Sequence, residues 1–540
     1  MRKYIQWFFR AMRPYGFSLF GMLFFHIVLI ASSLAFVYLS KSLVDTALGG
    51  TFSWHLTVLF LAVIVFRVVF NSLKNYLQTK IFVGLRNDLR MKLFDVLLRH
   101  QSDGTQPRHS GDVVNRLQED VRVVASTFST SIPNVIGTSI HFIAAFAYLM
   151  YLDSSLAWIV VVILPIALVL TRFVAGKIRR LTRKIRDDDS NVQAHLQENV
   201  QNLAVLKSMD YEDESSATLG SLQDVLYKSE MRRLRFSLIS RSLIGIAFTG
   251  GYAVAFLWSV NGLILGTITY GMMVAFLQLV SQVQRPILEI SNQLPTIIHS
   301  MASVDRLSDI EMLPQEKYGK PHLLQAPVGL RFENVSFTFP EGKIIFTDFS
   351  HNFKPGSATA VVGPTGVGKS TMVRLILSFL KPNSGTIKLY SGIPSSASEA
   401  MIDASTRGNI VYVPQGNSLF SGTVRDNLYL GNPDATEEEI SKALHTAVAE
   451  FVLELPKGLE TPCFESGGGL SEGQAQRIAI ARALLRPGSI LLFDEFSSAL
   501  DPDTESLLLE RLTNDLSHKT MIFVTHREKV LDYCNSILRL

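Results

Sequence analysis

Five long stretches of the chain contain no Asp, Glu, Lys or Arg, and they limit what its first half can fold into. They are residues 14–40, 46–66, 123–152, 154–171 and 242–284. A membrane-spanning helix needs about 20 mostly apolar residues, so the first four stretches hold one helix each. The fifth can hold two, with a turn between Asn261-Gly262 and Tyr270-Gly271. The sequence therefore predicts an all-α transmembrane domain of six helices over residues 14–300.

The segments between these stretches indicate how the domain is oriented. Segments 74–122 and 172–241 are rich in Lys and Arg, whereas the opposite loops carry almost none. Basic loops stay in the cytoplasm, which places both termini there and suggests the inner membrane of a bacterium. Apolar residues recur every three or four positions within 79–98, a helical period. We therefore expect the membrane helices to continue far into the cytosol.

The charge divides between the two halves of the chain. Residues 1–325 carry 32 Lys and Arg against 23 Asp and Glu, whereas residues 326–540 carry 19 against 24. A nucleic-acid partner would require basic residues on the soluble half, so none is expected. Cys463 and Cys534 lack metal-ligand spacing and fall in the cytosolic half, where a disulfide is not expected.

Two segments flank the predicted transmembrane domain. Residues 1–13 combine Arg and Lys with Trp7-Phe8-Phe9 and resemble an amphipathic helix at the membrane interface; a disordered basic tail is the alternative. Residues 301–325 are polar and contain Pro314 and Pro321, which predicts a linker into a soluble domain over 326–540.

Some polar residues fall inside the predicted spans. His26 and His141 suit either a hydrogen-bonded helix contact or contact with a transported substrate. Arg285 and Glu289 lie four residues apart, so they either pair on one helix face or line a cavity.

The soluble half contains a phosphate-binding loop. Ala358 to Val362 form an apolar strand pattern, and residues 363–370 read Gly-Pro-Thr-Gly-Val-Gly-Lys-Ser. Gly363, Gly366 and Gly368 let backbone N–H groups surround phosphates, and the following helix start adds positive potential. The predicted contacts are Lys369 with the β- and γ-phosphates, Ser370 with Mg²⁺, and Thr371 within the nucleotide site.

A second apolar run, Ile490 to Phe493, ends in Asp494-Glu495. We expect Asp494 to orient the shell of a Mg²⁺ ion and Glu495 to act as the general base that polarises the attacking water. Between these motifs lies Leu470-Ser471-Glu472-Gly473-Gln474, where Ser471 has the position of a helix N-cap. An exposed helix start of this kind is an anion site.

The order of these motifs resembles the ATP-binding cassette (ABC) family, and the six spans before them resemble its exporters. The resemblance implies that Ser471, Gly473 and Gln474 complete the ATP site of a partner cassette. It also assigns Phe339 to adenine stacking, Gln415 to Mg²⁺, Glu465 to the element before the signature, Asp501 to the D-loop and His526 to the γ-phosphate. Glu472 departs from the family, which usually has Gly there.

The same resemblance implies a coupling role for two cytosolic segments. Residues 110–120 resemble the first intracellular loop of ABC exporters, and we expect Arg116 and Asp120 to lie where membrane domain and cassette meet. Residues 211–214 have the place of the second such loop. Both could instead be solvated charged turns. The chain ends at Leu540, whereas the family usually continues with another strand, a turn and a helix, so we expect those closing elements to be missing.

The predicted protein is a half-size exporter that uses ATP and Mg²⁺ and works as a dimer embedded in membrane lipid. An intact Glu495 and signature favour a homodimer, and a heterodimer is the alternative. An ATP-gated channel or regulator, an importer on the same fold, and a soluble chromosome-type ATPase are the rival functions. The six spans and the lack of coiled-coil heptads disfavour the last. The transported substrate is not readable from the sequence.

Overall fold

The computed structural model describes residues 2–101, 110–316, 319–393, 398–464 and 469–540, without the side chains of 2, 5, 110, 160–175, 241, 244 and 247. The chain forms two compact units. Met1–Leu93 and Gly111–Asp309 form the first, and Phe94–Ser110 and Ile310–Leu540 form the second.

The regular secondary structure in the described residues of the first unit is all helical. Its helices are α1 (Arg2–Met12), α2 (Gly16–Leu48), α3 (Trp54–Leu98), α4 (Ser110–Asn115), α5 (Val121–Ser126), α6 (Ile132–Leu152), α7 (Ser154–Gln201), α8 (Leu203–Ser208), α9 (Glu212–Ile264) and α10 (Tyr270–Glu311). Short π-helical turns, Arg116–Asp120 and Thr127–Ser131, join α4 to α5 and α5 to α6. The gap between α9 and α10 confirms the turn predicted inside the fifth apolar stretch.

Several helices, α3, α7 and α9 above all, are much longer than a bilayer requires. Helices α3, α7 and α9 have 45, 48 and 53 residues, or roughly 70–80 Å each at 1.5 Å per residue, against about 30 Å of hydrocarbon. The predicted extensions are therefore present. Within the described residues, Gln6–Leu48, Trp54–Leu98 and Gly111–Leu152 are long and apolar enough to cross a membrane. The full count of six spans stays a prediction.

The N-terminal helix α1 has two different faces. Trp7 and Met12 are buried, and the rings of Trp7 and Phe8 lie 5.7 Å and 4.9 Å from that of Phe128. Phe9, in contrast, is 66% exposed. This separation of faces favours an interfacial helix over a disordered tail.

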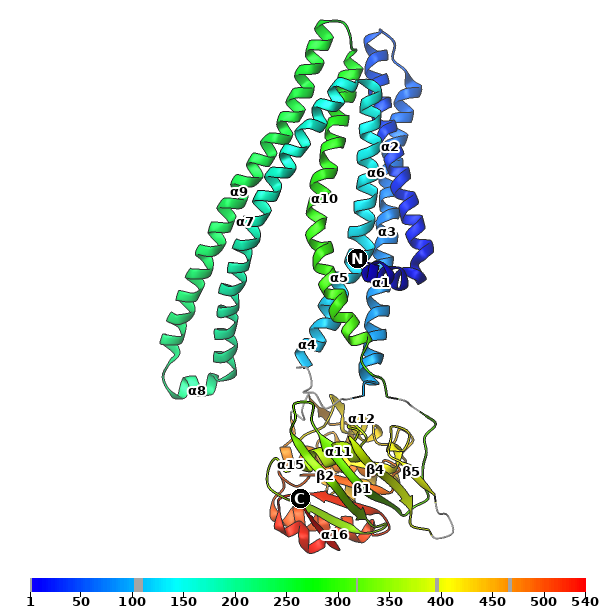
Figure 1. Ribbon diagram of the computed structural model, residues 1–540, viewed down its shortest axis with the longest axis vertical. Coiled ribbons are helices and arrows are strands. Elements are labelled where there is room, and N and C mark those ends of the chain that lie inside the picture. Colours follow the sequence, from blue (N-terminus) through cyan, green and yellow to red (C-terminus); the bar gives the residue numbers. More distant parts are fainter. Residues whose placement is uncertain (1, 102–109, 317–318, 394–397, 465–468) are drawn as a thin grey trace. The chain divides into compact units, whose positions relative to one another are not determined.

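Helices α7 and α9 lie side by side, are joined by α8, and diverge from the other helices of the unit at their α8 end (Figure 1). At the opposite end they pack against α2, α6 and α10 around Leu149, Leu156, Ala255 and Phe276. The indole N–H of Trp258 donates to Asp153, which also caps α7. The end of this helix pair near Asp153 is thus packed against α2, α6 and α10, whereas the α8 end diverges from the other described helices of the unit.

Helix α10 extends past residue 300, where the predicted membrane domain ends. It continues to Glu311 and includes the first part of segment 301–325. The reason is local: Val304, Leu307 and Ile310 recur at helical spacing and are buried. The prolines at 314 and 321 act only beyond that point.

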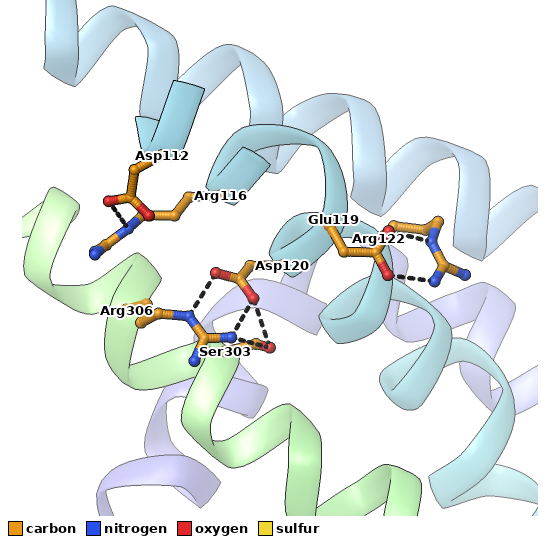
Figure 2. A network of polar contacts seen from close by, with 7 residues as sticks. All are labelled: Asp112, Arg116, Glu119, Asp120, Arg122, Ser303 and Arg306. Carbon is orange, nitrogen blue, oxygen red and sulfur yellow. Dashed lines mark hydrogen bonds and ion pairs between the residues drawn. The ribbon is translucent and has the colours of Figure 1, made fainter. Parts of the chain in front are cut away.

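The predicted coupling segment is tied to α10 by a buried carboxylate (Figure 2). Asp120 accepts a hydrogen bond of 2.8 Å from the Ser303 hydroxyl, and its other oxygen accepts one of 2.8 Å from the Arg306 Nε. Its side chain is only 8% exposed. Asp120 is therefore used inside the membrane unit, while Arg116 pairs with Asp112 at 2.9 Å. That either residue contacts the cassette stays a prediction.

In its described residues, the second unit contains three sheets and the helices that cover them. The strands are β1 (Val328–Thr338), β2 (Ile344–Phe353), β3 (Ala358–Val362), β4 (Ser384–Ser391), β5 (Glu399–Met401), β6 (Ile410–Val413), β7 (Gly422–Thr423), β8 (Pro462–Cys463), β9 (Ile490–Asp494), β10 (Thr520–Val524) and β11 (Ser536–Arg539). The helices are α11 (Lys369–Ile376), α12 (Val424–Tyr429), α13 (Glu437–Thr446), α14 (Phe451–Glu454), α15 (Glu472–Leu484) and α16 (Pro502–Asp515).

A five-stranded parallel sheet, in the order β11-β3-β10-β9-β6, lies between two hydrophobic cores. Successive residues of a strand point to opposite faces. Leu491 and Phe493 accordingly enter the core formed with α12–α16, and Ile490 and Leu492 enter the core shared with α11 and the antiparallel sheet β2-β1-β4-β5. Burial on both faces explains why these strands are continuously apolar.

The end of the chain differs in part from expectation. Residues 536–539 form β11, which pairs in parallel with β3. One of the closing elements expected to be missing is therefore present as an edge strand. Four residues suffice because their hydrogen bonds are to a strand that is already fixed by β10.

The buried carboxylate of Asp120 makes a stability prediction. Replacing Arg306 by Ala leaves this carboxylate without its charged partner, so we expect the free energy of unfolding to fall by about 1–3 kcal/mol. Arg122→Ala is the matched control, because Arg122 pairs with Glu119 on the surface, with both side chains about half exposed; its expected cost is below about 1 kcal/mol. Thermal unfolding in detergent measures both, and equal losses would contradict the assignment.

The two thiols make a second prediction. Burial raises the pKa of Cys463, and it raises that of Cys534 to about 11. Because the thiolate is the reactive form, both should react slowly with a maleimide at pH 7.5 in the folded protein and rapidly after denaturation. Fast labelling of the folded chain would show that at least one of the two thiols is not buried and would contradict this prediction.

Candidate functional site

The phosphate-binding loop lies between β3 and α11, as predicted. Gly366 and Gly368 have φ values of +84° and +118°, which residues with a side chain rarely adopt. A Cβ on Gly368 would also lie 2.5 Å from Ile345. The Lys369 ammonium donates to the carbonyl oxygens of Gly363 and Pro364 at 2.6 Å and 3.2 Å. The loop is thus curved around the position where phosphates bind in such motifs.

The acidic pair at the end of β9 is divided between two environments. Asp494 is buried, and burial followed by the adjacent Glu495 carboxylate raises its pKa, which the Tyr412 hydroxyl opposes. Glu495 has a φ of +47°, an uncommon value for a residue with a Cβ, and this turns its carboxylate away from the strand. Gln415 donates to one Glu495 oxygen at 2.7 Å, and His526 Nδ1 lies 3.4 Å from the other.

These residues converge because four parallel strands end at one edge of the sheet. The phosphate-binding loop follows β3, Gln415 follows β6, Glu495 follows β9 and His526 follows β10. Together with Phe339, Ser370 and Thr371 they line a cavity of about 730 Å³. The structure therefore brings most predicted ATP-site residues into one pocket.

The same pocket contains residues that sequence reasoning missed. Lys343 and Ile345 line it beside Phe339. The Tyr412 hydroxyl donates to the Asp494 carboxylate at 3.4 Å. Lys343 is held by a tight turn, since the Phe339 N–H donates to the Lys343 carbonyl at 2.9 Å. The sequence signal was the Pro340-Glu341-Gly342 turn, which places a cation next to the predicted aromatic residue.

The signature residues form a well-capped helix start elsewhere on the same unit. Ser471 is the N-cap of α15, and it exchanges hydrogen bonds with Gln474 at 3.2 Å and 3.0 Å in a capping box. Gly473 packs so closely that a Cβ would lie 2.8 Å from the Ala499 carbonyl. Asp501 caps α16 through the Thr504 N–H, which holds its pKa below the usual range.

None of the four residues Ser471, Gly473, Gln474 and Asp501 is among the described lining of the nucleotide pocket. Their expected role in a partner's site stays a prediction. Glu465, also assigned by resemblance, lies outside the described residues.

The oxygen groups near β9 suit a magnesium ion. Ser370 and Gln415 line the pocket, and a hydroxyl, an amide and a carboxylate are ligand types that Mg²⁺ accepts. The raised pKa of Asp494 reflects two adjacent carboxylates, one of them buried, and a divalent cation would stabilise their ionised forms. The donor set therefore fits the ion.

Several polar residues of the membrane helices have hydrogen-bond partners on another helix. His141 Nε2 donates to the Gln282 oxygen at 3.0 Å, and Ser33 donates to the same atom at 3.1 Å. His26 Nε2 is buried without a hydrogen-bond partner in the described residues. Glu289 accepts from Thr138 at 3.2 Å, and no ion pair between Arg285 and Glu289 is found in the described part of the chain.

Fold and site together define a P-loop ATPase domain fused to a helical transmembrane domain. Comparisons with known proteins specify the class. A family model described as the ABC transporter transmembrane region matches residues 19–287, and one described as ABC transporter matches residues 346–498. The chain therefore belongs to the ABC transporter family.

Full-length relatives support this assignment. A Bacillus subtilis (strain 168) protein named for multidrug export as an ATP-binding/permease protein is 30% identical over 552 residues, which cover 100% of this chain and 94% of the relative. An ATP-dependent lipid A-core flippase of Desulfotalea psychrophila is 30% identical, with 97% and 92% covered. A fatty acid ABC transporter ATP-binding/permease protein of Mycobacterium bovis is 30% identical, with 86% and 73% covered.

The fold agrees with a solved structure, that of a bacterial Atm1-family ABC exporter with ATP bound. The TM-score is 0.79 at 24% identity, with 98% of this chain and 93% of the other covered. The protein is an integral membrane ATPase with the exporter fold, and as an ABC transporter it couples ATP hydrolysis to transport.

The position of Glu495 generates a catalytic prediction. Glu495→Gln should keep ATP binding but lower steady-state hydrolysis below about a tenth of wild type, because an amide accepts no proton from water. Glu341→Gln is the matched control, since Glu341 is exposed on the nearby turn outside the pocket lining, and it should hydrolyse ATP normally. Phosphate release measures turnover, and a Gln variant with more than a tenth of normal activity would remove Glu495 from the role of base.

Proposed function

We propose that the protein exports an amphiphilic, lipid-like compound and that ATP binding and hydrolysis at paired cassettes drive the cycle. The proposal that ATP drives the cycle rests on one observation: the phosphate-binding loop, Gln415, Glu495 and His526 line the same pocket. Relatives named for a lipid A-core and for fatty acids support an amphiphilic substrate. We assign the membrane domain to residues 14–300 and the ATPase domain to 326–540. Residues 301–325 connect them, and α10 takes up the part of this connection to Glu311.

Within the ATP site, each side chain has a role that follows from its position. Lys369 binds the terminal phosphates, and Phe339 stacks on the base. Ser370, Gln415 and Asp494 would hold Mg²⁺, which supplies charge neutralisation at the phosphates when bound. Glu495 takes a proton from water, and His526, beside it at 3.4 Å, orients the terminal phosphate.

The proposed working unit is a homodimer, in which Ser471 and Gly473 of one chain meet the nucleotide of the other. Exposed apolar side chains at the α8 end of the α7–α9 pair support this proposal, because a second chain could cover them. Val200, Leu203 and Met209 are 71%, 51% and 70% exposed beside α8. Such a patch at the end of a long extension is typical of an interaction surface. A heterodimer would use the same contacts.

We further propose that the protein lies in a bacterial cytoplasmic membrane with its ATPase domain and termini in the cytoplasm. The basic segments 74–122 and 172–241 support this orientation, as does the need of the ATPase for cytosolic ATP.

Lipid movement in reconstituted vesicles tests the proposed function. In proteoliposomes with outward-facing cassettes, ATP should accelerate transfer of fluorescent acyl lipids away from the cassette-facing leaflet, as measured by dithionite quenching. Glu495→Gln vesicles are the control and should show only the passive rate. Equal rates in both preparations, across lipids of different head groups, would contradict export of lipid-like compounds.

Mixed dimers test whether the ATP sites are shared between chains. Lys369→Ala and Ser471→Arg should each inactivate a homodimer, because every site then lacks a phosphate ligand or a closed interface. In an isolated mixed dimer, both defects fall in one site and the other keeps an intact Lys369 and Ser471. We therefore expect measurable hydrolysis and one trapped nucleotide per mixed dimer. A mixed dimer that neither hydrolyses nor traps nucleotide would contradict composite sites.

A further inference from the structure

Two adjoining cavities lie among the membrane helices of the first unit. The larger, of about 790 Å³, is lined by α2, α3, α6 and α10, and a second, of about 470 Å³, lies beside it. Four residues line both: Ser33, Arg67, His141 and Glu289. The two cavities therefore form one continuous site, which we call the membrane cavity.

The membrane cavity is predominantly cationic. Arg67, Lys74 and Arg285 line it, and Glu289 is the one carboxylate among its described lining residues. Glu289 accepts a hydrogen bond from Thr138 at 3.2 Å. Neither arginine forms an ion pair with another residue of the described chain. Cations at membrane depth are costly unless they are paired or face a cavity that serves a function.

Two of these cations lie at a similar depth. Arg67 is roughly 20 Å along α3 from Trp54, and Arg285 is roughly 22 Å along α10 from Tyr270, at 1.5 Å per residue. Both helices start at the same end of the unit (Figure 1). Lys74 is roughly 30 Å from that end. All three cations thus lie roughly 20–30 Å from the end of the unit at which α3 and α10 begin.

One part of the lining suits an acyl chain, although amide and hydroxyl side chains line much of the remainder. Leu29, Ile30, Ile64 and Val68 are apolar walls of the larger cavity. The Arg67 guanidinium lies 5.4 Å from the Phe36 ring centroid, so this ring supports the guanidinium through its face. A guanidinium presents parallel N–H donors that match a carboxylate or a phosphate.

From this arrangement we infer that the membrane cavity binds an anionic amphiphile, with its carboxylate or phosphate group at Arg67 and Arg285 and its acyl chain along the apolar wall. The inference rests on the proposed function, because it names the substrate class of the same transporter. An anion would neutralise the excess charge that Glu289 leaves uncompensated. A cationic compound would be repelled, and a neutral one would leave the charge of both arginines uncompensated.

Equilibrium binding tests the inference without requiring turnover. The Glu495→Gln protein in phosphatidylcholine nanodiscs is titrated with radiolabelled dodecyl phosphate below its micellar concentration. Dodecyltrimethylammonium, dodecylphosphocholine and inorganic phosphate serve as competitors. We expect saturable binding of dodecyl phosphate, at least about tenfold weaker binding of the other two dodecyl compounds, and weak competition by inorganic phosphate, which lacks the chain.

Variants locate the site. Arg67→Gln with Arg285→Gln should weaken dodecyl phosphate binding at least about tenfold and should not weaken dodecyltrimethylammonium. Arg67→Lys, which keeps the charge, should lose less. Arg10→Gln is the matched control: Arg10 is exposed on α1 and outside the cavity lining, so binding should be unchanged. Stabilisation of each variant by ATP verifies folding.

Nanodiscs that contain phosphatidylglycerol identify the source of the amphiphile. Competition by this lipid would assign the site to an anionic bilayer lipid, and its absence would assign it to a soluble amphiphile; either result supports the inference. The inference would be overturned if the Glu495→Gln protein bound the three dodecyl compounds with equal affinity. It would also be overturned if Arg10→Gln weakened binding as much as Arg67→Gln with Arg285→Gln. ATP-dependent lipid transfer without head-group preference would leave the proposed function intact and reject the inference alone.

Discussion

The ATP site depends on the burial of one parallel sheet between two hydrophobic cores. Because side chains of β9 and β10 alternate between these cores, a shift of one residue would move every buried side chain to the wrong face. The register is therefore fixed, and with it the edge where β3, β6, β9 and β10 end. Glu495, Gln415 and His526 come from distant parts of the chain, yet they meet beside the phosphate-binding loop because they follow neighbouring strands.

The membrane unit solves a different problem, that of placing charge in an apolar medium. Its polar groups are handled in two ways. Asp120, in segment 110–120 outside the long charge-free stretches, is paired with Arg306 and Ser303 (Figure 2), which fixes that segment to α10. Arg67 and Arg285 have no such partner in the described chain and line a cavity instead. Paired charges thus fasten helices, whereas unpaired ones are available to a ligand.

Much of this organisation was predictable from the sequence. The charge-free stretches, the helical period of 79–98 and the apolar runs before the phosphate-binding loop and Asp494 are local patterns, and local patterns decide which segments become helices or strands. The boundaries were less predictable. Helix α10 continues to Glu311 because tertiary contacts bury Val304 and Ile310, and β11 forms because β3 offers a free edge. Such stabilisation comes from neighbours that are distant in sequence.

The sequence by itself determined the class of protein, the two-domain order and the identity of the phosphate-binding loop and Glu495, because each depends on residues adjacent in the chain. Only the tertiary structure decided that Tyr412 donates to Asp494, that Asp120 faces α10, and that Arg67 and Arg285 share one cavity. The contact of Asp120 with α10 and the shared cavity of Arg67 and Arg285 join residues that are hundreds of positions apart. They arise from strand order and helix packing, in which the burial of apolar surface brings together groups that no sequence spacing relates.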